Sequence, residues 1–288
     1  LKIACVIPNL TAIRHDVVRI FSAKFNDPMS YNIAAGQRLN TLPIIQAALK
    51  AINNQWPSLL QSPYIATNEA DIEIGAASDK MRRDNNIKDI TPPSLLPILT
   101  KLQSQFPEST LLKRSNTLHQ HQNNQPKQQT LTQWLTDFIE SLHILQWPGH
   151  RSLNSIEQQI VNRWNKAIEE LTECDEIIGM LDNQQAYQIL EGHIEQIIFQ
   201  EKSQNSPIQI LGSLETAGMS FDHLWLMGLD NESWPAASAA NPFLPYQLQR
   251  EHNMPHASAQ RELLFTQATQ KRLINSAPYI YLSSANQS

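Results

Sequence analysis

Cysteine is scarce in this chain of 288 residues, which contains only Cys5 and Cys174. The two are far apart and neither belongs to a CxxC pair, so the sequence excludes a zinc ribbon and disfavours a disulfide scaffold. We expect both to be buried free thiols in a reducing compartment, the cytoplasm.

Long apolar runs are also missing. No segment approaches the roughly 18 apolar residues that a membrane span requires, and no signal-peptide pattern opens the chain, so we expect no membrane partner. The net charge of -5 excludes a global basic surface for duplex DNA but leaves a local basic groove open. Because the sequence begins at Leu1, directly on a strand-like segment, we interpret it as a piece of a longer protein.

Local motifs of catalysis are lacking as well. No glycine is followed by lysine, so the GxxxxGK[ST] loop that cradles phosphates is missing, as are GxGxxG, HExxH and GxSxG. His119 and His121 lie in a polar segment, residues 113–129, which has no periodicity and predicts a surface loop without further metal ligands. We therefore expect no catalytic residue, no metal and no cofactor in this chain.

Hydrophobic residues make up 41% of the sequence, enough for a packed core. Residues 2–8 and 30–36 predict buried strands, each followed by an amphipathic helix, which favours a parallel sheet with crossovers. Periodic segments are then nearly all helical, until strand patterns return after residue 206. The sequence therefore predicts an α/β fold whose sheet domain (residues 1–56 and 206–288) is interrupted by a helical insertion, residues 57–205.

The last predicted helix, residues 258–277, has a mixed sequence. We expect Leu263, Leu264, Leu273 and Ile274 on its inner face, with either Thr266 or Gln267 between them.

The segment GSLETAGMSFDHLWLMGLDNESWP, residues 212–235, contains three of the eight glycines and places a glycine turn between two apolar runs. Together with NPFLP (residues 241–245), it resembles the second motor domain of superfamily 1 helicases of the UvrD/RecB type. The similarity is to the degenerate form in AddB-like, RecB-family exonuclease DNA-repair proteins. Residues 3–21 and 31–52 resemble the start of the helicase 2A domain, residues 59–65 the start of the inserted 2B domain, residues 208–235 motif V, and residues 241–283 motif VI with the last strand.

This resemblance implies a RecA-like parallel sheet domain interrupted by a large all-helical insertion. It also exposes departures from the active pattern. Gly212, Leu214, Ala217 and Ser220 replace the threonine, histidine, lysine and glutamate of motif V, whereas Gly218, Phe221 and Asp222 keep their types. Gln270 stands where motif VI has an arginine that stabilises charge on the transferred phosphoryl group. We therefore expect no ATP hydrolysis by this chain.

The resemblance further implies contacts with single-stranded DNA from a strand end, from the glycine turn and from the last helix. The candidates are Asn9, Arg38, Glu215, Thr216, Gly218, Trp234, Arg261, Lys271 and Arg272. Gly218 has an equal alternative, a turn that needs only a positive φ. Trp234 has the alternative of burial against the sheet edge instead of stacking on a base.

The function expected from the resemblance is a non-catalytic helicase-like module of a DNA-repair exonuclease, which helps to form a channel for single-stranded DNA. Its expected partners are a helicase-like domain before it and a nuclease domain after it in the same parent, together with a helicase–nuclease partner subunit. Two alternatives stay open. One is a protein-interaction scaffold that touches no DNA, and the other is half of an active ATP-dependent motor.

Overall fold

The structure, a computed structural model, describes residues 1–25, 30–87, 92–173, 175–201, 206–230 and 233–284. The chain forms two compact units. The sheet unit comprises Leu1–Gly36 and Gln200–Ser288, and the helical unit comprises Gln37–Phe199. In sequence, the helical unit therefore lies between the two parts of the sheet unit.

The sheet unit is built on five parallel strands in the order β2-β5-β1-β6-β7. They are β1 (Ile3–Val6), β2 (Tyr31–Ile33), β5 (Ile208–Leu211), β6 (His223–Leu226) and β7 (Tyr279–Leu282). Strand β1 is central, with Ile3 opposite both Ile208 of β5 and His223 of β6. The protein is thus a mixed α/β protein, as the sequence predicts.

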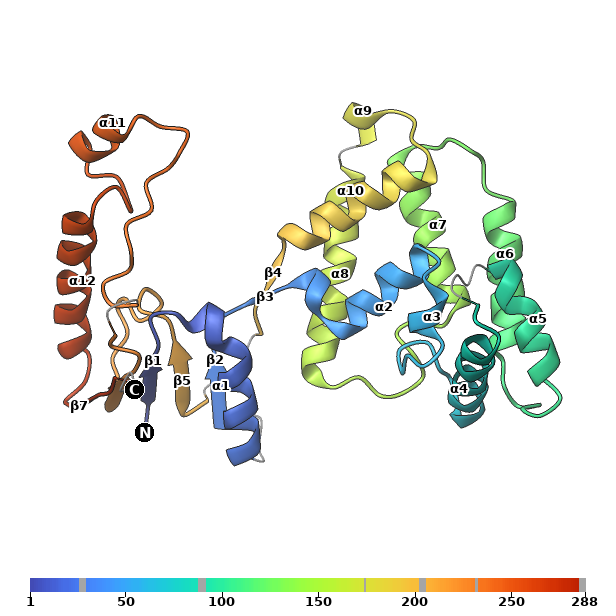
Figure 1. Cartoon of the computed structure of the whole chain (residues 1–288), viewed down its shortest axis with the longest axis horizontal. Coiled ribbons are helices and arrows are strands. Elements are labelled where there is room, and N and C mark those ends of the chain that lie inside the picture. Colours follow the sequence, from blue (N-terminus) through green and yellow to red (C-terminus); the bar gives the residue numbers. More distant parts are fainter. Residues whose placement is uncertain (26–29, 88–91, 174, 202–205, 231–232, 285–288) are drawn as a thin grey trace. The chain divides into compact units, whose positions relative to one another are not determined.

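Alternate side chains of β1 point to opposite faces of the sheet, and a helix covers each face (Figure 1). Cys5 packs with Leu10 and Val17 of α1 (Leu10–Lys24). Val6 packs in the cluster that contains Leu273 of α12 (Ala259–Ile274). The central strand is therefore buried on both sides, as parallel sheets require. Burial also raises the pKa of the free Cys5 thiol, while Cys174 lies outside the described residues.

Helix α12 forms where the sequence predicts it, and its predicted inner face is confirmed at Leu273 and at Thr266 but wrong at three other positions. Leu263, Leu264 and Ile274 are 45%, 61% and 46% exposed. Besides Thr266 and Leu273, the buried positions are Glu262 and Thr269, which the sequence did not predict. The Glu262 carboxylate accepts hydrogen bonds from the Arg261 guanidinium and from the backbone N–H of His256, and a polar group with such partners can be buried at little cost.

The helical unit contains nine α-helices among its described residues. They are α2 (Pro43–Ile52), α3 (Trp56–Leu59), α4 (Glu69–Asp84), α5 (Pro92–Leu102), α6 (Leu111–Asn123), α7 (Leu131–Ile144), α8 (Ser155–Thr172), α9 (Asp175–Ile178) and α10 (Asn183–Gln196). A 3₁₀ turn, Leu39–Thr41, precedes α2. The short strands β3 (Gln37–Arg38) and β4 (Ile198–Phe199) pair antiparallel where the chain enters and leaves the unit.

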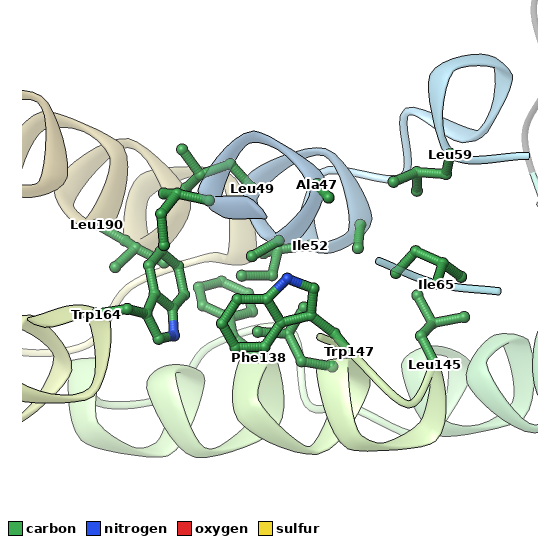
Figure 2. Close-up of a cluster of buried hydrophobic side chains, with 14 of the residues drawn as sticks. Ala47, Leu49, Ile52, Leu59, Ile65, Phe138, Leu145, Trp147, Trp164 and Leu190 are labelled. Atoms are coloured by element: carbon green, nitrogen blue, oxygen red, sulfur yellow. The ribbon is translucent and has the colours of Figure 1, made fainter. Parts of the chain in front are cut away.

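The division between the units falls at residue 36, twenty residues before the boundary expected from the sequence. The reason is α2, whose apolar side chains belong to the core of the helical unit. The indole Nε1 of Trp147 donates to the Ile44 carbonyl of this helix at 2.9 Å. Figure 2 shows that core, with Ala47, Leu49 and Ile52 among Phe138, Trp147 and Trp164.

The polar segment 113–129, expected to be a loop, is largely helical. Helix α6 covers Leu111–Asn123 and buries Leu111, Arg114, Ser115 and Leu118. The sequence lacks the apolar periodicity of a helix here because one of the buried positions is an arginine and another a serine.

Arg114 forms a buried ion pair with Asp71, at 2.6 Å between Nη2 and Oδ2. Its Nη1 also donates to the carbonyl oxygens of Ile65 and Leu145. The other oxygen of Asp71 accepts from the Ser109 hydroxyl at 2.7 Å. This cluster joins the start of α4, the start of α6 and the end of α7.

We predict that Arg114→Ala lowers the free energy of unfolding by about 3–5 kcal/mol, because it leaves the Asp71 carboxylate buried without its ionic partner. Urea unfolding followed by tryptophan fluorescence measures this, since Trp56, Trp134, Trp147 and Trp164 all lie in the helical core. The matched control is Arg38→Ala, which removes the half-exposed pair with Glu195 and is expected to cost less than about 1 kcal/mol. Equal losses in the two variants would contradict the account.

The same cluster predicts a sensitivity to acid. Burial acts to raise the pKa of Asp71, but hydrogen bonds from Thr67 and Ser109 and the charge of Arg114 outweigh it and hold that pKa below its ordinary value. Ionised Asp71 therefore stabilises the fold above about pH 4, the value for an unfolded chain, and this contribution is lost as the pH falls through the folded pKa.

Asp71→Asn removes this titration, so we expect its free energy of unfolding, although lower at pH 7, to fall less steeply than that of the wild type between about pH 5 and 2. Urea titrations at a series of pH values measure the slope. Parallel curves for the two proteins would contradict the assignment.

Candidate nucleic-acid interface

The connection from β5 to β6, residues 212–222, is a tight turn followed by an extended stretch. The Thr216 hydroxyl donates to the Ser213 carbonyl at 2.9 Å, and the Met219 N–H donates to the Thr216 carbonyl at 3.1 Å. Phe221 is buried, and its N–H donates to the carbonyl of Ser276, beyond the end of α12. The first two bonds close the turn, and the bond from Phe221 ties the connection to the end of α12.

A cavity of about 350 Å³ lies between this turn and α12. Three of the predicted site residues line it, namely Thr216, Gly218 and Arg272. The other polar groups around it come from Ser213, Ser220, Thr269, Asn275 and Ser276. Among the described residues that line the cavity, Arg272 is the one that carries a charge.

Arg272 is anchored beside the cavity, because its Nη2 donates to the Thr269 hydroxyl at 3.1 Å. Thr269 itself is buried. Lys271, the next candidate, is exposed in the same last turn of α12. The cavity therefore offers one anchored guanidinium and several hydroxyls, a donor set that suits a phosphate group.

Gly218 has a φ of 77°. A Cβ added to it would meet no atom within 4 Å. Glycine is therefore required by the backbone conformation and not by a close contact within the chain. The positive-φ alternative is thus present in the structure, while a DNA contact at this position stays a prediction.

Asn9 and Glu215 both follow strands at the carboxyl edge of the sheet. Asn9 is the N-cap residue of α1; it is exposed, and its side chain makes no capping hydrogen bond. The Glu215 side chain folds back over Gly212, where a Cβ would overlap its carboxylate. A carboxylate at this position repels phosphate, so Glu215 suits a role in shaping the turn.

Three other candidates already have partners within the protein. Trp234 packs, half-buried, against the cluster under α12, which matches the alternative of burial. The Arg261 guanidinium donates to Glu262 at 2.9 Å and lies over the Phe265 ring, 4.9 Å from its centroid. Arg38 lies in the helical unit and is ion-paired with Glu195 at 2.8 Å.

Sequence reasoning missed the polar residues of α12 and its end that complete the cavity, chiefly Thr269, Asn275 and Ser276. One signal was present. Thr266, Thr269 and Leu273 recur at the spacing of a helical face, so a threonine-containing face of α12 was detectable in principle.

In the described part of the chain, no helix combines the length and apolarity needed to cross a membrane. That part also contains no group of three or more histidine, cysteine, aspartate or glutamate side chains that could hold a metal ion. Comparison of the sequence with protein-family models gave no match, and no curated protein matches it.

We predict that Gly218→Ala lowers the free energy of unfolding by about 1–2 kcal/mol, because a side chain at this φ is strained although the space around it is open. Chemical denaturation measures the change. The matched control is Gly192→Ala, at an open position inside α10, where alanine is expected to stabilise by roughly 0.5–1 kcal/mol. A neutral Gly218→Ala would show that the turn relaxes into another conformation.

Proposed function

We propose that this chain is a non-catalytic helicase-like module of a RecB/AddB-type DNA-repair exonuclease of the cytoplasm, and that it helps to form a channel for single-stranded DNA. In this proposal the sheet unit is a RecA-like 2A domain and the helical unit is its 2B-like insertion. The parent protein supplies a helicase-like domain before this chain and a nuclease domain after it, and a helicase–nuclease subunit is a further partner.

The observation that carries the proposal is the meeting of two segments at one cavity. Residues 212–222 resemble motif V and α12 resembles motif VI, and 36 residues, 223–258, separate them in the chain. Both line the same cavity, with Thr216 and Gly218 on one side and Arg272 on the other. A shared site for these segments supports the resemblance because it arises from tertiary packing, which their sequences alone do not require.

The chemistry of the cavity favours a phosphate of the nucleic-acid backbone over a base. A guanidinium and hydroxyl donors recognise phosphate oxygens without reading sequence. Gln270, where the resemblance places an arginine, is neutral and cannot stabilise charge on a transferred phosphoryl group. The proposal therefore assigns DNA contact to this site and no ATP hydrolysis, and the active motor half is the least favoured alternative.

A protein-interaction scaffold is the second candidate, because exposed apolar side chains are concentrated in the sheet unit. Among the described large hydrophobic residues that are exposed, all but Ile72, Met180 and Ile198 belong to it. On β6 and β7, Trp225, Tyr279 and Tyr281 are 41%, 61% and 56% exposed. These surfaces suit docking of other domains, which is compatible with DNA binding at the cavity.

We predict that the protein binds a fluorescein-labelled oligo(dT) with an affinity that falls as salt rises, and that Arg272→Gln weakens this binding. Removing one phosphate contact lowers the magnitude of the slope of log K against log salt by roughly 0.7. Fluorescence anisotropy over a series of salt concentrations measures both the affinity and the slope.

The matched control is Arg83→Gln, which removes an exposed arginine from the last turn of α4 in the helical unit. Its salt slope is expected to equal that of the wild type. Absence of binding at low salt would refute the DNA-binding proposal and leave the scaffold. Equal effects of the two substitutions would show that binding is a matter of net charge and does not involve the cavity.

A further inference from the structure

Phe243 is the most exposed large hydrophobic residue among those described, at 92%. It lies in the long connection that leaves the carboxyl edge of the sheet after β6 and leads to α11 (Tyr246–Glu251). Ligands of parallel α/β sheets bind at this edge. A fully exposed phenylalanine at this edge lowers solubility and contributes nothing to the core. Folding therefore does not explain why Phe243 is exposed.

The loop that carries Phe243 is held by a buried amide. Gln249 is 1% exposed, and its Nε2 donates to the carbonyl oxygens of Asn241 and Leu244, each at 2.8 Å. Its Oε1 accepts from the Asn241 N–H at 2.9 Å. The Asn241 side chain in turn accepts from the Phe243 N–H at 2.9 Å. Asn241 and Leu244 are thereby tied to one buried side chain, and Phe243, which lies between them, is tied to Asn241. Phe243 is therefore presented on an ordered loop.

The other side of this loop is supported by a strained connection between α11 and α12. Asn253 and His256 have φ values of 49° and 62°, in the left-handed region. The Met254 N–H donates to the Gln249 carbonyl at 2.9 Å, and the His256 N–H donates to the buried Glu262 carboxylate at 2.9 Å. These bonds maintain two strained residues close together. Backbone strain that is maintained in this way is concentrated at binding sites.

Helix α11, which begins three residues after Phe243, carries an exposed aromatic ring and a positive charge. Tyr246 is 53% exposed, and the Arg250 guanidinium lies 5.7 Å from its ring centroid. Glu251 accepts a hydrogen bond from Gln247. Phe243 itself helps to line a cavity of about 680 Å³, together with the rest of residues 239–244, Gln249 and residues 254–256. This volume is in the range of small-ligand sites.

We propose that this surface, Phe243 with Tyr246, Arg250 and the adjoining cavity, is a base-stacking site for single-stranded nucleic acid. The inference rests on the proposed function and adds a second contact to the cavity at Arg272. Aromatic faces stack on any base, and an arginine beside them pairs with the phosphate backbone. Because the loop is held in place before binding, little conformational entropy is lost when a base stacks on Phe243.

The test compares Phe243→Leu with Phe243→Trp in anisotropy titrations against oligo(dT) and against an abasic oligonucleotide of the same length. Leucine keeps the apolar character but not the aromatic face, so Phe243→Leu is expected to bind oligo(dT) about 5- to 100-fold more weakly, and Phe243→Trp to bind as well as the wild type. On the abasic strand, Phe243→Leu and the wild type are expected to bind equally. Arg250→Gln is expected to lower the magnitude of the salt slope by roughly 0.7.

Tyr279→Ala, which removes another exposed aromatic residue, from β7, is the matched control and is expected to leave the affinity unchanged. Thermal melts by circular dichroism check that the variants are folded. If the wild type binds oligo(dT) and Phe243→Leu binds it equally well, the inference is wrong while the proposed function stands. Equal weakening on both oligonucleotides would also overturn it, because the contact would then not involve bases. No binding by the wild type overturns both proposals.

Discussion

The pairing of β1 with β5 on one side and β6 on the other is the interaction on which the rest of the structure depends. Ile3 lies opposite both Ile208 and His223, so strands from the beginning and from the later part of the chain form one sheet. The chain therefore leaves this sheet to form the helical unit and then returns to it.

Since β5 and β6 are both parallel to β1, the connection between them has to pass from the carboxyl edge of the sheet to the amino edge across β1. That connection, residues 212–222, contains no helix, and it passes on the face covered by α12, where Phe221 and Leu273 share a cluster. The cavity at Arg272 is a consequence of this crossing.

The sequence predicted the strands and the α/β class because buried parallel strands are short, continuous apolar runs, rich in β-branched residues and bounded by turn residues. The boundary expected from the sequence lies later than the observed one because α2 is apolar on nearly every side and fits either a sheet or a helical core. Only tertiary packing, such as the hydrogen bond from Trp147 to Ile44, decides between the two.

The expectations for α6 and for part of α12 failed for a common reason. Arg114 and Glu262 are buried, each with an ionic partner, and hydrophobic periodicity cannot show that a charged residue has such a partner elsewhere in the chain.

The candidate site, like the fold, was predictable from the sequence only in part. Thr216, Gly218 and Arg272, which were named from the proposed resemblance to helicase motifs, line one cavity. The resemblance could not show that Arg261 is occupied by Glu262 and Phe265, or that Arg38 is paired with Glu195, since both facts depend on packing. Nor did it single out Phe243, whose significance arises from the buried Gln249 that orders its loop. Charge and exposure identify candidates, whereas partners within the protein decide which of them remain free for a ligand.

The central claim is that single-stranded DNA contacts the sheet unit at the turn after β5 and at the end of α12. Photo-crosslinking of an oligo(dT) that carries 4-thiothymidine, followed by mass spectrometry of the tryptic peptides, tests this most directly because it maps contacts in the unmodified protein. The account predicts crosslinks to the peptides that contain residues 212–222 and residues 269–276. Crosslinks confined to the helical unit, or to the sheet unit away from these two segments, would contradict it.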